Sequence, residues 1–125
     1  MSERILVVED EAVRETIVST LNAANYECQE AADGLEALVL LDSGKKFEVV
    51  LCKLRMPNPH GIGLLEHLRD KYSDIQLVVT TSVEDISVAL TAIRNGAYDY
   101  LLKPFDREQL LNTVGRALEN RKTIA

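Results

Sequence analysis

The sequence contains no apolar run that approaches the roughly 20 residues needed to cross a bilayer as a helix. Its N-terminus enters an apolar run of only four residues, 5–8, which ends in acidic residues and does not fit a secretory signal peptide. Cysteine is scarce, and Cys28 and Cys52 lack CxxC spacing. These features predict a cytoplasmic domain with two buried, reduced thiols, with a disulfide or a metal role as the alternative.

Basic residues are outnumbered by acidic ones, 14 against 20, which gives a formal net charge of -6 and a pI of about 4.9. An acidic domain repels nucleic-acid phosphates, so we expect no DNA or RNA binding by this segment. The lack of a long apolar run predicts no membrane partner. The 125 residues fit one domain, 1–125, and 46% hydrophobic residues suffice to bury a core. Acidity also suits a divalent-cation site, although composition cannot place it.

Short apolar runs alternate along the chain with longer segments of helical period. We expect strands at 5–8, 26–31, 47–52, 77–80 and 98–102, each followed by a helix. Asp106 is a good N-cap for the last helix. This (βα)5 alternation predicts an α/β fold with a doubly wound, five-stranded parallel sheet of order 2-1-3-4-5, as in flavodoxin-like proteins.

Polar residues follow the predicted strands at the edge where such sheets bind ligands. They are Glu9, Asp10, Lys53, Thr81, Ser82 and Lys103. Two adjacent acids are tolerated where they hold a hard cation or face a positive side chain. A hydroxyl and a lysine can both donate hydrogen bonds to an oxyanion. The constellation suggests phosphoryl chemistry with Mg²⁺, and a solvated polar rim is the plainer alternative.

Five stretches of the sequence resemble the receiver domain of response regulators in bacterial two-component signalling. They are ILVVEDE at 5–11, DGLEA at 33–37, LRMP at 54–57, VVTTS at 78–82 and GAYDYLLKPF at 96–105. The resemblance implies that Glu9 and Asp10 bind Mg²⁺ and that the Thr81 hydroxyl moves onto the phosphoryl group. It further implies that Lys103 pairs with a phosphoryl oxygen, that Tyr100 is an aromatic switch, and that the Lys103–Pro104 bond is cis.

The resemblance also implies an aspartate phosphoacceptor at position 53, where this chain has Lys53. An ammonium neither accepts a phosphoryl group from phosphohistidine nor binds a cation. We therefore expect a pseudo-receiver that needs no cofactor, with a weakened Mg²⁺ site and the Lys53 ammonium bridging Glu9 and Asp10. Such a pair gives about 4 kcal/mol gross at ~4 Å and an effective dielectric of ~20. The sequence leaves open whether Lys53 is natural or an engineered replacement in an ordinary receiver.

The partners implied by the resemblance are proteins. A histidine kinase or phosphotransfer protein is the ancestral donor, and residues 118–125 look like the start of a linker to an output domain. The fourth helix, fifth strand and fifth helix form the family's usual partner surface, which also allows a homodimer. The resemblance implies a signalling module and not an enzyme.

Two other classes share this architecture. An FMN-binding flavodoxin needs a hydroxyl- and glycine-rich first loop, whereas residues 9–11 are all acidic. A dehalogenase-type phosphatase needs Asp-x-Asp at the end of the first strand, which these residues do not provide. His60 and His67 have no metal-like partners nearby in sequence, and we expect both to be solvated.

Overall fold

The computed structural model of the chain describes residues 3–55 and 61–124. The expectation for His60 and the end of the LRMP stretch lie outside the described residues. The strands are β1 (Arg4–Val8), β2 (Glu27–Ala31), β3 (Val49–Lys53), β4 (Gln76–Thr81) and β5 (Asp99–Leu102). The helices are α1 (Glu11–Ala23), α2 (Gly34–Leu41), α3 (Gly61–Lys71), α4 (Ile86–Arg94) and α5 (Arg107–Ile124), with a short 3₁₀ turn, η1 (Val83–Asp85), before α4.

All neighbouring strands pair in parallel, in the order β2-β1-β3-β4-β5. The predicted α/β doubly wound topology is therefore confirmed. Strand bounds differ from the predicted ones by one or two residues, and β3 extends far enough to include Lys53. In the register of β3 and β4, Lys53 lies opposite Thr80.

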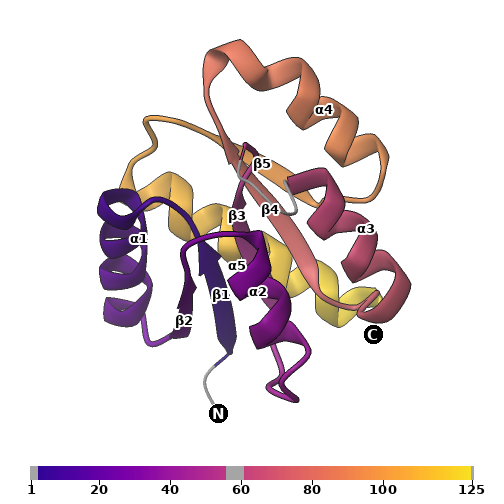
Figure 1. The fold of residues 1–125 in the computed structure, drawn as a ribbon. Coiled ribbons are helices and arrows are strands. Elements are labelled where there is room, and N and C mark those ends of the chain that lie inside the picture. The colour runs from indigo at the N-terminus through magenta and orange to yellow at the C-terminus, as the bar shows by residue number, and fades with distance from the viewer. Residues whose placement is uncertain (1–2, 56–60, 125) are drawn as a thin grey trace.

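Helices cover both faces of the sheet (Figure 1), and alternate strand residues supply the two halves of the core. Leu6 and Val8 pack with Leu64 and other residues beneath α2, α3 and α4. Ile5 and Val7 pack on the opposite face, with residues of α1 and α5. Burial on both faces explains why the central strands read as continuous apolar runs.

Two helices begin with an aspartate whose side chain caps the helix, and the sequence predicts one of them, Asp106. Asp33 accepts a hydrogen bond from the amide of Glu36 at the start of α2. Asp106 accepts one from the amide of Gln109, whose side chain in turn accepts one from the amide of Asp106. This reciprocal arrangement is a capping box, and it confirms Asp106 as the N-cap of the last helix.

The C-terminal segment is helical through Ile124, so residues 118–124, which we expected to open a linker, are the last turns of α5. Asn120 donates a 2.8 Å hydrogen bond to the side chain of Gln76, and Arg121 pairs with Asp74 at 2.9 Å. These contacts hold the end of α5 against the beginning of β4. A connection to an output domain stays a prediction.

Candidate functional site: two ion pairs at the carboxyl edge of the sheet

The predicted polar residues meet at the carboxyl edge of the sheet because parallel strands all end there. Glu9 and Asp10 directly follow β1, Lys53 is the last residue of β3, and Lys103 follows β5. The Lys103–Pro104 peptide bond is cis, as the resemblance implied.

Glu9 carries a fully buried carboxylate that is compensated on several sides. Lys103 Nζ lies 2.8 Å from Glu9 Oε2, and the hydroxyl of Thr80 donates a hydrogen bond to the same oxygen. The amide of Asp10 donates to Glu9 Oε1 at 3.0 Å. A buried charge is costly unless it is paired and hydrogen-bonded, and these three donors meet that requirement.

Asp10 is paired with Lys53 near the surface. Lys53 Nζ lies 2.6 Å from Asp10 Oδ2, with side-chain exposures of 31% for Lys53 and 64% for Asp10. The hydrogen bond from Lys53 holds the pKa of Asp10 below its usual value. Burial opposes this effect as the second largest cause, and the charges of Lys53, Lys103 and Arg14 add to the lowering.

The expected bridge from Lys53 to both acids is wrong in its detail. Lys53 contacts Asp10, whereas Glu9 is taken by Lys103 and Thr80. The reason is geometric, because Glu9 points into the protein beside β4 and β5 while Asp10 points outward. The site thus has two separate ion pairs and a formal charge of zero.

Thr80 belongs to this site, although the sequence reasoning placed the switch hydroxyl at Thr81. Thr81 is also buried, and its hydroxyl donates to the carbonyl of Ser82 at 3.3 Å. Tyr100 is half-buried and packs against the core beneath α2, α3 and α4. The register was the signal that could have found Thr80, because it lies opposite Lys53.

The two ammonium groups of this donor set oppose a Mg²⁺ ion. Mg²⁺ needs octahedral oxygen ligands, and here each carboxylate already faces an ammonium. Within residues 3–55 and 61–124, no group of three or more His, Cys, Asp or Glu side chains could hold a metal ion. The two lysines instead neutralise the charges of the two carboxylates.

A third cation–acid contact lies on the rim of the site. Arg55 Nε is 2.8 Å from Asp85 Oδ2 and thereby joins the segment after β3 to η1. On the other side, Arg14 donates to the carbonyl of Glu9 at 2.8 Å and pairs with Glu30 at 3.1 Å. The end of β3 therefore contributes two cations, Lys53 and Arg55, to neighbouring acids.

We expected His67 to be solvated, but its side chain is only 21% exposed and is hydrogen-bonded. Its Nε2 lies 3.3 Å from Asp42 Oδ1, which also accepts a 2.6 Å hydrogen bond from the hydroxyl of Tyr72. These contacts lower the pKa of Asp42, with Tyr72 as the larger cause. They join the end of α2 to α3, a long-range contact that local sequence could not indicate.

Cys28 and Cys52 are both thiols. Burial raises the pKa of the Cys52 thiol, which is fully enclosed in the core. Cys28 is only half-buried, against our expectation of full burial, and its pKa is raised to about 11. Thiols with raised pKa values are poor nucleophiles.

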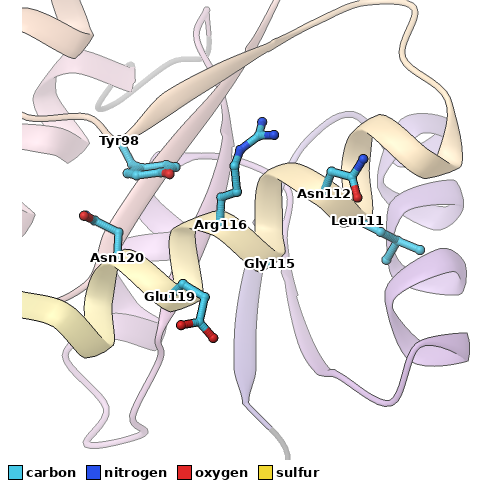
Figure 2. Close-up of a pocket in the computed structure, with 7 residues that line it drawn as sticks. All are labelled: Tyr98, Leu111, Asn112, Gly115, Arg116, Glu119 and Asn120. Carbon is cyan, nitrogen blue, oxygen red and sulfur yellow. The ribbon is translucent and has the colours of Figure 1, made fainter.

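A separate hollow lies on α5, away from the two ion pairs. Figure 2 shows Tyr98 beside the start of β5, facing Arg116 and Asn120 on α5. The lining is mixed, with an aromatic ring, charged groups and amides. It lies on the surface that the resemblance assigns to protein partners.

The described helices include none that is long and apolar enough to pass through a membrane. This finding concerns residues 3–55 and 61–124.

Comparison with known proteins gives one consistent match. A family model described as the response regulator receiver domain matches residues 5–115. The chain is 40% identical over 124 residues to the response regulator MprA of Mycolicibacterium vanbaalenii, covering 98% of this chain and 53% of that protein. It is 31% identical over 115 residues to the DNA-binding transcriptional regulator NtrC of Escherichia coli, covering 92% of this chain and 24% of that protein.

Solved structures agree with the sequence matches. The receiver domain of NtrX from Brucella abortus superposes with a TM-score of 0.86 at 30% identity, covering 92% of this chain and 98% of that one. This chain spans about half or less of the length of MprA and NtrC.

Proposed function

Because the chain belongs to the response regulator receiver domain family, we propose that it is a two-component receiver that is not phosphorylated at residue 53 and acts as a pseudo-receiver through protein contacts. The observation that carries the proposal is the 2.6 Å contact between Lys53 Nζ and Asp10 Oδ2. In this proposal the ammonium takes the place of the acceptor carboxylate that the resemblance implies at residue 53.

The chemistry of that exchange supports a silent acceptor. Phosphoryl transfer to a receiver needs a carboxylate nucleophile, and a lysine acts as a nucleophile only when it is deprotonated. Lys53 Nζ is also engaged by the carboxylate of Asp10 at 2.6 Å, so it is not presented as a free nucleophile. An acyl phosphate therefore does not form at residue 53.

The same exchange weakens Mg²⁺ binding in this proposal. The cation loses one carboxylate ligand and meets a positive charge beside the two acids that remain. Lys53 supplies the charge compensation at Asp10, and Lys103 supplies it at Glu9.

A silent acceptor changes what can move the switch residues. A ligand shifts an equilibrium only by binding one state better, and without a phosphoryl group Thr81 and Tyr100 lose that driver. We propose that a protein partner replaces it on the surface of α4, β5 and α5, where the hollow of Figure 2 lies. The relatives named as transcriptional regulators favour an output domain as that partner. The resemblance implies a histidine kinase as the ancestral donor.

The test is to restore the acceptor with Lys53→Asp and incubate the chain with a small acyl phosphate and Mg²⁺. Intact-mass spectrometry should show the addition of one acid-labile phosphoryl group to Lys53→Asp and none to the parent. Lys53→Asn is the matched control, because it removes the ammonium without supplying a nucleophile. Phosphorylation of the parent on any pocket carboxylate would contradict the proposal.

A further inference from the structure

Asp85 occupies the position directly before α4, where aspartate is among the preferred helix caps. Its carboxylate makes no capping hydrogen bond to α4 and instead pairs with Arg55 Nε at 2.8 Å. The Asp85 side chain is 17% exposed, whereas that of Arg55 is 67% exposed. One carboxylate therefore has two possible partners, and the structure shows it with the cation.

The backbone of Asp85 is consistent with this choice. Capping residues have extended backbones, as Asp33 does with φ -155° and ψ 179°. Asp85 instead has φ -108° and ψ 12°, because it is the last residue of η1. The turn is held by hydrogen bonds from the amide of Asp85 to the carbonyl of Ser82 at 3.1 Å and from the amide of Ile86 to the carbonyl of Val83.

We propose that Arg55 controls where α4 begins by holding Asp85 away from the helix. When the Arg55–Asp85 pair breaks, the backbone of Asp85 becomes extended, its carboxylate caps α4, and η1 opens. The two arrangements exclude each other, because the capping backbone is incompatible with the 3₁₀ turn.

The two arrangements are close enough in free energy to exchange. An N-cap is worth roughly fivefold in an equilibrium constant, and an ion pair with one exposed partner is worth about fivefold or less. Neither interaction alone therefore fixes the start of α4.

The position of Arg55 makes this a connection between the site and the proposed partner surface. Arg55 lies two residues after Lys53, and α4 is the first element of the surface formed by α4, β5 and α5. The inference does not depend on the proposed silencing of residue 53, because it concerns the unphosphorylated chain alone.

The test is amide hydrogen exchange by NMR on the 125-residue chain. In Arg55→Gln the amides of residues 85 and 86 should lose protection by roughly fivefold, because Asp85 is released to cap α4. Asp85→Asn should do the same, since asparagine caps as well as aspartate but cannot form the ion pair. The parent at ~1 M salt should shift in the same direction.

The discriminating variant is Asp85→Ala, which loses the ion pair and also the ability to cap. It should keep the protection at residues 85 and 86, and so should the double variant with Arg55→Gln. Arg116→Gln, which removes a similarly exposed arginine paired with Asp99, should change nothing at η1. Equal loss of protection in Arg55→Gln and Asp85→Ala, or no loss in Arg55→Gln, would overturn the inference.

Discussion

Lys53 and Asp10 form an ion pair at the mouth of the site, with Asp10 well exposed to solvent. The lowered pKa of Asp10 depends first on the hydrogen bond from Lys53 and least on the charge of Arg14. In Lys53→Gln, we expect the titration midpoint of the Asp10 side-chain carboxyl carbon, followed by NMR, to rise. Arg14→Gln should shift the midpoint less, and an equal shift in both variants would contradict the assignment of Lys53 as the main cause.

The same pair has a definite effect on stability as a function of pH. Asp10 has a depressed pKa in the folded state, so its contribution is present above the unfolded value of about 3.9 and is lost as the pH falls through the folded value. The size is under about 1 kcal/mol, because solvent screens exposed pairs. Urea unfolding should show the parent more stable than Lys53→Gln at pH 7, with a smaller difference at pH 2.

Thr80 has the larger energetic role, because its partner is the buried Glu9. Thr80→Val keeps the shape but removes a donor from a buried carboxylate, and we expect a loss of about 1 to 3 kcal/mol in the free energy of unfolding. Thr80→Ser keeps the hydroxyl and should lose less. If both variants unfold at the same urea concentration, the hydrogen bond contributes little.

The convergence of Glu9, Asp10, Lys53 and Lys103 could be predicted from the sequence, because strand ends in a parallel sheet share one edge. The pairing of each acid with a particular lysine could not be predicted. It depends on Glu9 turning inward and Asp10 turning outward. Both acids follow the same strand, β1, so the apolar pattern does not tell them apart. The contacts of Thr80 with Glu9 and of His67 with Asp42 join residues distant in the sequence, so local patterns did not indicate them.

At the scale of elements, four aspartates of the described residues directly precede a helix, and two of the four cap it. Asp33 and Asp106 do so, each followed three residues later by Glu or Gln, and this spacing is readable in the sequence. Asp10 and Asp85 occupy the same position before α1 and α4 but make no capping hydrogen bond. Both serve cations at the end of β3, a tertiary effect that overrides the local signal. The sequence reasoning likewise missed η1.

The capping hydrogen bond of Asp106 predicts a loss of stability when the side chain is removed. Asp106→Ala should lower the free energy of unfolding by about 1 kcal/mol, because it removes a working cap. Asp106→Asn should restore most of this loss. Urea denaturation at constant pH measures both, and an Asp106→Ala variant as stable as the parent would show that the capping box is dispensable.

For the whole molecule, the order of the strands could be predicted because a regular alternation of buried strands and helices permits few topologies. The continuation of α5 to Ile124 could not, because it depends on contacts of Asn120 and Arg121 with the distant Gln76 and Asp74.

Charge at the site should set how the whole chain responds to Mg²⁺. Lys53→Asp adds a third acid beside Glu9 and Asp10, so the variant should be less stable than the parent without divalent ions. Mg²⁺ should then raise its melting temperature in a concentration-dependent way, because a ligand that binds only the folded state stabilises it. The parent should respond no more than it does to NaCl of equal ionic strength. A matching Mg²⁺ response in the parent would show that Lys53 does not block the ion.

The ammonium beside Asp10 is covalently part of β3 and cannot diffuse away. A free cation leaves a site when the solution is diluted or a chelator is added, whereas a tethered one keeps a fixed effective concentration. Charge balance around Asp10 therefore does not require a divalent cation from the surroundings, and EDTA leaves it unchanged.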